Sequence, residues 1–230
     1  MDGRRETARL ELKPIGPADA DLLWQLHQDP GIARWYAGIW STSQASEFAS
    51  AMGHAWQTGG VGKWLAYRRE DAVLVGRGGC SLAVVEDRRQ LEIGWAVREE
   101  HWGRGYATEI GLAGLNFAFE TLHADHVVSF TEAHNLRSRA VMERIGMTHV
   151  HDFHRAGLIE GSEDIHDDAV FALYQVAAAA LNRQERTFAE RLKAALRDNP
   201  SDEGFADNLE AAHADLRSAF STVSTPDYRG

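Results

Sequence analysis

Glu92-Ile-Gly-Trp-Ala-Val-Arg-Glu-Glu-His-Trp-Gly-Arg-Gly-Tyr-Ala-Thr-Glu109 is the stretch that decides how this chain folds. An apolar strand pattern leads into a loop with Gly103 and Gly105, and a helical pattern starts directly afterwards. Glycine tolerates positive φ and lets the backbone approach a ligand closely. The first amides of a helix lack intrahelical acceptors, and the helix dipole favours anions there. The stretch therefore predicts a strand, a loop and a helix N-terminus that cradle a phosphate group.

Neither of the common phosphate-binding signatures fits this loop. No Lys-Ser or Lys-Thr pair follows the glycines, as a P-loop requires, and the third glycine of a dinucleotide-binding turn is missing. The sequence therefore indicates a phosphate cradle of another kind.

The segments before the loop predict a strand, two helices and three further strands. The first helix begins at Asp19 and ends at Asp29-Pro30-Gly31, and the second ends at Gly59-Gly60. Acidic turns separate the three strands, as in an antiparallel meander. The expected ranges are strand 7–13, helix 19–29, helix 43–57, and strands 63–69, 74–86 and 91–98.

The segments after the loop predict alternating helices and strands, then a change of character. The expected ranges are helix 107–122, strand 126–131, helix 135–145, and strands 148–155 and 168–174. This order predicts one α/β (α+β) domain over residues 1–175, with a mixed, mostly antiparallel sheet flanked by helices. The alanine-rich residues 176–230 predict an amphipathic helical hairpin. That hairpin either packs on its own domain or serves as a dimerisation or partner-binding element.

Composition limits the function classes. The 230 residues are 44% hydrophobic and 25% charged, and 24 basic against 34 acidic residues leave a net charge of −10. An acidic surface repels phosphate backbones, so nucleic-acid binding is disfavoured. Cys80 is the single cysteine, which excludes an internal disulfide and a cysteine-based zinc site. The absence of an apolar leader and of a long apolar run predicts a cytoplasmic protein without a membrane segment.

Two blocks of the chain resemble one enzyme family. Trp102-Gly-Arg-Gly-Tyr-Ala-Thr-Glu109, preceded by Glu92-Ile-Gly-Trp95, resembles the acetyl-CoA loop of the GNAT N-acetyltransferases, most closely the branch of the RimJ and RimL ribosomal-protein acetyltransferases. The superfamily has Gln or Arg where this chain has Trp102, a departure that is usual in this branch. The second block, residues 131–147, resembles the branch's Asn-x-x-Ser helix that ends in Gly-Met. The resemblance covers residues 7–175 and implies the GNAT fold.

The resemblance implies acetyl-CoA as cosubstrate and no metal. Carried over residue by residue, it implies that the backbone amides of the loop bind the pyrophosphate and that Val97, on a splayed strand, pairs with the pantetheine arm. Asn135 then lies near the thioester end. The implied pyrophosphate-binding residues are Trp102, Gly103, Arg104, Gly105, Tyr106, Ala107 and Thr108.

Acetyl transfer to an amine needs a neutral amine, stabilisation of the oxyanion and a proton for the leaving thiolate. Glu92 is our candidate base, acting through a water, and the alternative is a carboxylate that only holds the strand or orients the amine. Ser138 is the candidate proton donor to the sulfur, and the alternative is a hydroxyl that caps backbone. Glu132 is also within reach, and Glu109 is expected to support the loop.

Several other residues have simpler interpretations. His149, His151 and His154 resemble a metal cluster, but a solvated strand is the preferred interpretation because nothing indicates that they converge. Cys80 is expected to fill the core. Trp35-Tyr36 and Trp40 fall in the helix connection that borders the acceptor site in this family, so they are candidates for an apolar acceptor wall.

The sequence therefore predicts an N-acetyltransferase that moves an acetyl group from acetyl-CoA to a primary amine by direct attack in a ternary complex. The acceptor is either a protein N-terminus or a small amine, and a homodimer is one option for assembly. The alternative function is a catalytically silent CoA-binding or interaction module on the same fold.

Overall fold

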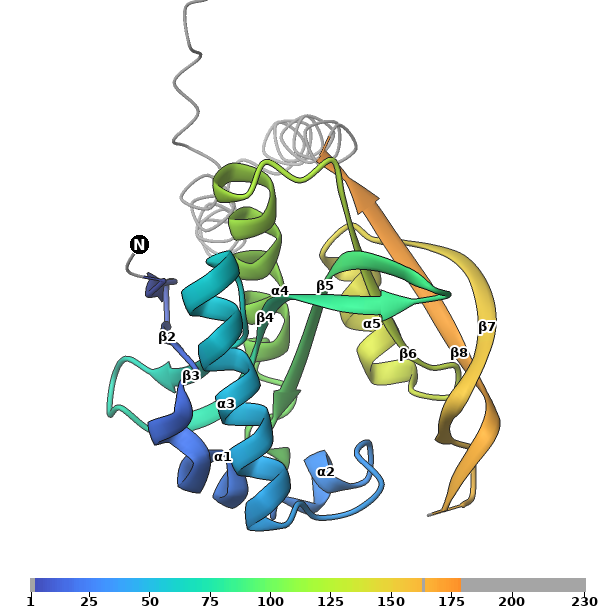
Figure 1. Ribbon diagram of the computed structural model, residues 1–230, viewed down its shortest axis with the longest axis horizontal. Helices are drawn as coiled ribbons and strands as arrows, with labels where there is room; N and C mark the ends of the chain where they lie inside the picture. Colours follow the sequence, from blue (N-terminus) through green and yellow to red (C-terminus); the bar gives the residue numbers. More distant parts are fainter. Residues whose placement is uncertain (1–2, 163, 179–230) are drawn as a thin grey trace, which may run out of the picture.

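The computed structural model describes residues 3–162 and 164–178, which form one eight-stranded sheet in the order β1-β2-β3-β4-β5-β6-β8-β7. Within it the β5–β6 pair is parallel, and the other neighbouring pairs are antiparallel. Figure 1 shows α1 and α3 together on one side and the long β7–β8 ribbon at the other. The expected mixed, mostly antiparallel sheet with flanking helices is confirmed.

The strands are β1 Arg5–Glu6, β2 Leu10–Pro14, β3 Trp64–Arg68, β4 Leu74–Val85, β5 Arg88–Val97, β6 His126–Glu132, β7 Thr148–Leu158 and β8 Ile165–Ala177. The helical segments are η1 Pro17–Asp19, α1 Ala20–Leu26, α2 Pro30–Ala33, α3 Thr42–Gly59, η2 Glu99–His101, α4 Tyr106–Asn116, the π-helical turn η3 Phe117–Thr121 and α5 Leu136–Arg144.

Several boundaries differ from the sequence expectation. The strand expected at 7–13 begins only at Leu10, after a bend that separates it from β1, and the last two strands are longer than expected, since β7 ends at Leu158 and β8 begins at Ile165. The expected stop at Asp29 is the start of α2, because the Asp29 carboxylate accepts the N–H groups of Gly31 and Ile32 and Pro30 suits the first helical position. The helix expected to reach residue 122 leaves α-geometry after Asn116 and continues as η3. Strand β8 continues past residue 175 to Ala177, and the remainder of the expected hairpin, residues 179–230, lies outside the described residues.

The sheet separates two apolar cores, since successive side chains of a strand point to opposite faces. In β3, Trp64 and Ala66 pack with α4 residues such as Ile110, whereas Leu65 packs with Ala45 and other residues of the α1–α3 side. Helix α4 therefore covers one face of the central strands, and α1 and α3 cover the other. Among the described residues, no helix has both the length and the apolar character needed to cross a membrane.

Strands β5 and β6 meet at one point only. Glu92 on β5 pairs with Val128 on β6, and no further rung joins the two strands in the described residues. Strand β6 meanwhile stays paired with β8 along its whole length, and β5 stays paired with β4 up to Val97. The two strands therefore diverge after Glu92 and leave open backbone edges facing each other, as the resemblance implied.

The first prediction concerns Gly76 on β4. A Cβ there would lie 2.3 Å from the Ala96 carbonyl oxygen of β5, so Gly76→Ala must push two backbones apart. We expect the free energy of unfolding to fall by about 1–3 kcal/mol. Urea denaturation measures this change.

Gly59→Ala is the matched control. Its Cβ would meet Val61 at 3.6 Å, an ordinary contact, inside helix α3. A gain of about 0.5 kcal/mol is expected from the lower entropy of the unfolded chain. Equal effects of the two substitutions would contradict the account of the β4–β5 contact.

Candidate active site

A cleft of about 1950 Å³ opens where β5 and β6 diverge. Its wall consists of the end of β5, the loop after it, the start of α4, the end of β6 and the first turns of α5. The sequence-predicted residues from Glu92 to Ser138 all line this one cleft. The structure thus brings the two sequence blocks together at the opening of the sheet.

The loop between η2 and α4 presents unpaired amides to the cleft. Gly103 and Gly105 have φ of +74° and +80°, a region that suits glycine, and Gly105 is the N-cap residue of α4. The first hydrogen bond of this helix runs from the Glu109 N–H to the Gly105 carbonyl at 3.0 Å. Within the described part of the chain, the N–H groups of residues 103–108 have no acceptor. This arrangement suits an anion at the helix N-terminus.

Trp102 fixes the end of β5 with its side chain. Its indole Nε1–H donates to the Val97 carbonyl at 2.7 Å. A Cβ on Gly31 of α2 would lie 2.7 Å from the indole ring, so the glycine lets α2 pack directly against it. The Arg137 guanidinium lies 4.4 Å from the ring centroid on the other side of the loop. The side chain that departs from the superfamily pattern therefore joins three elements of the site.

Arg9 and Glu109 anchor the loop to the N-terminal segment. The Arg9 guanidinium donates to Glu109 Oε2 through Nε and Nη2, at 2.9 and 2.6 Å. Its Nη1 donates to the Arg104 carbonyl at 2.9 Å, and its guanidinium lies 4.9 Å from the Tyr106 ring centroid. The supporting role expected of Glu109 is thus exerted through Arg9, which sequence reasoning missed.

Basic side chains surround the mouth of the cleft although the whole chain is acidic. Arg9, Arg104, Arg137 and Arg144 all line it, and Arg144 donates to the Thr108 hydroxyl at 3.2 Å. These four residues come from three distant segments, so only Arg104 was identifiable from the loop sequence. Glu109 offsets the charge of Arg9, whereas the other three arginines have no carboxylate partner among the described residues and suit a polyanion in spite of the net charge of −10.

At the open edge of β5, every second residue turns its backbone N–H and C=O groups away from β4. Arg98 N–H donates to Val75 of β4, so the alternation of an antiparallel ladder turns the backbone groups of Val97, Trp95 and Ile93 away from β4. The Val97 carbonyl is occupied by Trp102. Pairing with an extended ligand therefore falls to the Val97 N–H and to the backbone of Trp95, a residue that sequence reasoning did not select.

Glu92 lies in an ion pair. Lys63 Nζ donates to Glu92 Oε2 at 2.6 Å and to the Gly79 carbonyl at 2.8 Å, and the two side chains are 8% and 13% exposed. The Ser81 hydroxyl donates to the same Glu92 oxygen at 3.4 Å. One carboxylate oxygen is therefore held by two donors, and Oε1 lies over Gly94, where a Cβ would come within 2.6 Å of it.

Asn135 and Ser138 occupy the first turn of α5. The Asn135 amide is buried and engaged on both sides, since its Oδ1 accepts the Ser138 N–H at 3.2 Å and its Nδ2 donates to the Thr131 hydroxyl at 3.0 Å. The Ser138 hydroxyl makes no hydrogen bond with the described residues and lines the cleft. Asn135 thus caps the helix that presents Ser138, and Ser138 is the group with a free hydroxyl.

Glu132 is a second carboxylate on the cleft wall. It ends β6, its side chain is buried, and it accepts the Thr131 hydroxyl at 3.3 Å. Burial raises the pKa of the Glu132 carboxyl above its usual value. A carboxyl group with a raised pKa can take up and release a proton in catalysis, so Glu132 is an alternative candidate to Glu92 for the role of general base.

Aromatic side chains wall the cleft on the α1–α3 side. Trp35 and Tyr36 line it, and Trp35 lies 5.3 Å from His134 of the β6–α5 connection, ring centroid to centroid. Trp40 lies behind them, stacked on His27 at 3.4 Å. Trp35 and Tyr36 thus line the cleft with Trp40 behind them, and their use as an acceptor wall stays a prediction.

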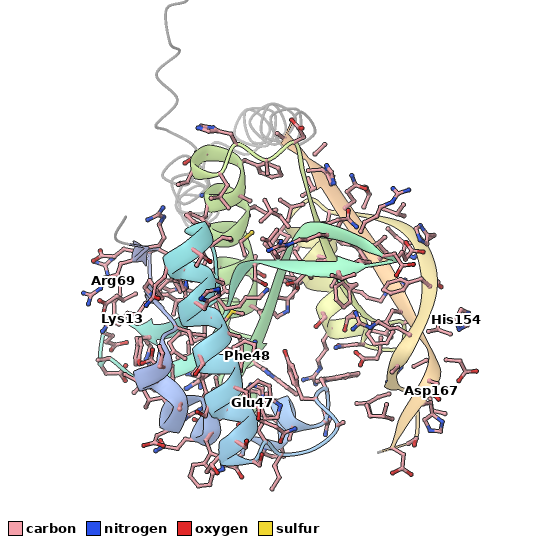
Figure 2. All side chains as sticks on the ribbon, viewed as in Figure 1. Lys13, Glu47, Phe48, Arg69, His154 and Asp167 are labelled. Carbon is pink, nitrogen blue, oxygen red and sulfur yellow. The ribbon has the colours of Figure 1, made fainter. Side chains whose placement is uncertain are left out.

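The remaining candidates do not form a site. His149 bonds to Asp152 and His151 to Glu86, whereas His154 bonds to the Asp168 carbonyl at the outer edge of the molecule (Figure 2). Cys80 is fully buried, and burial raises the pKa of its thiol to about 12, which keeps it protonated in the core. In the ranges 3–162 and 164–178 no three His, Cys, Asp or Glu side chains are placed to hold a metal ion.

Comparison with known proteins identifies the family of this architecture. A family model described as an acetyltransferase (GNAT) domain matches residues 9–148. The FsC-acetyl coenzyme A-N(2)-transacetylase of Aspergillus fumigatus is 30% identical over 161 residues, which cover 64% of this chain and 66% of that protein.

Two solved structures are similar in fold. An acetyltransferase from Agrobacterium tumefaciens has a TM-score of 0.59 at 25% identity, covering 75% of this chain and 93% of that one. The ribosomal-protein-S5-alanine acetyltransferase of Vibrio fischeri has a TM-score of 0.60 at 12% identity, covering 76% and 96%, and this likeness shows the fold alone.

The second prediction concerns Gly105. Gly105→Val places a β-branched side chain at a φ of +80° and 3.4 Å from Arg9 Nη2, so it disturbs the amides of the loop. We expect binding of acetyl-CoA, measured by calorimetry, to weaken at least about a hundredfold, as the loss of several charge-assisted hydrogen bonds requires.

Gly161→Val is the control for backbone strain alone. Gly161 has a φ of +82° with no neighbour within 4 Å of a Cβ, and it lies outside the cleft. Undiminished affinity in Gly105→Val would refute the anion cradle, and so would equal weakening in both variants.

The third prediction concerns His27. Burial and the nearby Arg77 lower its pKa from 6.5 to about 2, so the folded chain keeps it neutral. Below about pH 6.5 the unfolded chain binds a proton that the folded chain does not, and the free energy of unfolding falls by up to about 1.4 kcal/mol per pH unit. Urea denaturation from about pH 7.5 to about pH 4.5 measures this slope. His27→Gln should have a flatter slope, and equal slopes would contradict the assignment.

Proposed function

The chain belongs to the GNAT acetyltransferase family and is an N-acetyltransferase, and we propose that it transfers the acetyl group of acetyl-CoA to a primary amine by direct attack within a ternary complex. The observation that carries the proposal is the single-rung contact of β5 with β6, beside a loop whose amides at residues 103–108 have no acceptor. The open edge of β5 suits the pantetheine arm of acetyl-CoA, and the unpaired amides of the loop suit its pyrophosphate.

The donor lies along the opening in this proposal. The amides of residues 103–108 bind the pyrophosphate, with Arg104, Arg137 and Arg144 at the mouth neutralising its charge. The pantetheine arm pairs with the Val97 N–H and the Trp95 backbone. The thioester then lies near the point where β5 and β6 meet, between Glu92 and Ser138.

The protein holds the reacting groups rather than supplying strong acids and bases. An α-amine has a pKa of about 8, so a sizeable fraction is neutral near pH 7. Glu92 accepts the proton of the attacking amine through a water, using the oxygen that Lys63 does not bind.

The leaving group receives its proton from Ser138. The hydroxyl is unengaged within the described residues and can reorient to donate to the CoA sulfur. Bonds and protons balance: the amine nitrogen bonds to the acetyl carbon, the carbon–sulfur bond breaks, and the thiolate takes a proton from Ser138. Solvent water then returns a proton to Ser138, and Glu92 releases the proton of the amine to solvent. Asn135 acts as a positioning residue, because it caps the helix turn that carries Ser138.

The acceptor is a protein N-terminus or a small amine. The loop with Trp102 and the Asn-x-x-Ser helix support placement in the RimJ/RimL-like branch, and the S5-alanine acetyltransferase shares this fold. The FsC transacetylase, by its name, acts on a small molecule at N(2). A thiol-release screen over amino acids, polyamines, arylalkylamines and peptide N-termini tests the proposal. Thiol release no faster with amine than by hydrolysis would favour the silent CoA-binding module instead.

The fourth prediction compares two carboxylates. A general base typically contributes about a hundredfold or more to the rate, so Glu92→Gln should lower kcat by about a hundredfold. The affinity for acetyl-CoA should stay within about twofold, because Glu92 does not touch the pyrophosphate in this proposal.

Glu132→Gln serves as the matched comparison on the facing strand. It should keep most of kcat. The opposite pattern, a kcat nearly unchanged in Glu92→Gln and lowered by about a hundredfold in Glu132→Gln, would transfer the role of base to Glu132.

A further inference from the structure

Arg77 is the charged side chain that the catalytic proposal leaves unexplained. It belongs to β4, lines the cleft and is 3% exposed. Its Nε–H donates to His27 Nε2 at 2.9 Å. In the described part of the chain, no carboxylate pairs with it, and its Nη1 and Nη2 groups have no acceptor. A guanidinium so deeply buried costs free energy unless something compensates its charge.

Aromatic rings enclose this guanidinium on its sides. Its central carbon lies 4.9 Å from the ring centroid of Tyr36, 5.4 Å from that of Trp40 and 4.6 Å from that of Phe48. Phe48 belongs to α3 (Figure 2), and the other two precede that helix. His27 is neutral here and accepts from Nε, so it removes no charge. The ring contacts and this hydrogen bond hold the guanidinium in place and leave its Nη1 and Nη2 groups free to bind a ligand.

Arg77 faces the reaction centre along the sheet. Paired residues of neighbouring strands share a face, and the rungs run Arg77–Ala96, Gly79–Gly94 and Ser81–Glu92. Arg77 and Glu92 therefore lie on the same face, four residue positions or about 14 Å apart along the strands. The glycine rung between them carries no side chain, and the Glu92 carboxylate leans over Gly94.

The buried charges on this wall do not balance. Lys63 and Arg77 supply two cations at 6% and 3% exposure, and Glu92 supplies one anion, which Lys63 binds. The other buried carboxyl of the cleft, Glu132, ends β6 on the facing wall, and burial raises its pKa and so disfavours its charged form. One positive charge on the acceptor side is left for a ligand to neutralise.

We propose that Arg77 anchors a carboxylate of the acceptor, so that the substrates of this enzyme are amines that carry a carboxylate, of about the size of an amino acid. The inference rests on the function proposed above. The two Nη groups match the two oxygens of a carboxylate end-on. The body of the acceptor then lies against Trp35 and Tyr36, and its amine lies beside Lys63 and Glu92.

The test uses acceptors that differ only in the carboxylate. Thiol release by the full chain with acetyl-CoA is measured for phenylalanine, tryptophan and leucine, for their carboxamides, and for the corresponding decarboxylated amines. We expect kcat/KM for the acid to exceed that for the amide by at least about tenfold, the effect of one charge-assisted bidentate contact. The amides have the more acidic ammonium groups, so intrinsic reactivity works against this result.

Variants assign the preference to Arg77. Arg77→Gln should bring the acid and the amide to within about twofold by lowering the acid alone, and Arg77→Lys should retain part of the preference, because the charge stays but the fork is lost. Arg89→Gln, on the exposed part of β5, is the control and should change neither. Unfolding curves and acetyl-CoA titration show that each variant is folded and binds the donor.

The outcomes separate this inference from the proposed function. If acetyl-CoA does not bind and no amine releases thiol, the proposed function fails. If thiol is released but amides, amines or peptide N-termini serve as well as acids, the carboxylate anchor alone is wrong. Where neither the acid nor its carboxamide is acetylated, their affinities are measured instead by calorimetric titration into the CoA-saturated protein. An acid that binds no more tightly than its carboxamide would also overturn the inference.

Discussion

The single rung between β5 and β6 is the constraint on which the site depends. A parallel pair of strands would normally continue its hydrogen bonds, but here β5 follows β4 while β6 follows β8, and the two diverge after Glu92. Open backbone groups in a protein interior are costly unless a ligand or water satisfies them. The opening persists because Trp102 holds the end of β5 through the Val97 carbonyl and Asn135 holds the start of α5. The fold thus keeps an opening between β5 and β6, whereas each of these strands is paired with its other neighbour.

The two walls of the cleft differ in charge and in the kind of ligand that they suit. The mouth on the α4 side has exposed arginines and free amides, which suit a polyanionic carrier in contact with solvent. The wall on the α1–α3 side has two buried cations, one carboxylate and aromatic rings, which suit a small and partly apolar acceptor. Because Glu92 lies where β5 and β6 meet, the two ligands would meet beside it. In the proposed function, the donor and the acceptor are therefore recognised by different walls of the cleft.

Local patterns predicted the elements and the loop. The glycines at 103 and 105 have the positive φ that their use in an anion cradle requires, and the order of strands and helices follows from apolar periodicity. The α2 helix was missed because four residues are too few to show a period, although Asp29 and Pro30 form a good helix start. The tail hairpin stays a prediction, since residues 179–230 lie outside the described residues.

Long-range pairs explain what the sequence could not predict. Lys63 and Glu92 are 29 residues apart, Arg77 and His27 are 50 apart, and Arg9 and Glu109 are 100 apart. No local signal marks Lys63, directly before β3, as the partner of a carboxylate, or Arg77, within β4, as a buried cation. Only the folded chain brings both side chains to the same cleft.

A crystal structure of the complex with acetyl-CoA tests the central claim most directly. The account predicts pyrophosphate oxygens within about 3 Å of the amide nitrogens of residues 103–108, the distance of an N–H···O hydrogen bond, and pantetheine along the free edge of β5. A complex in which β5 and β6 close on each other, or in which the cofactor lies elsewhere on the protein, would contradict it.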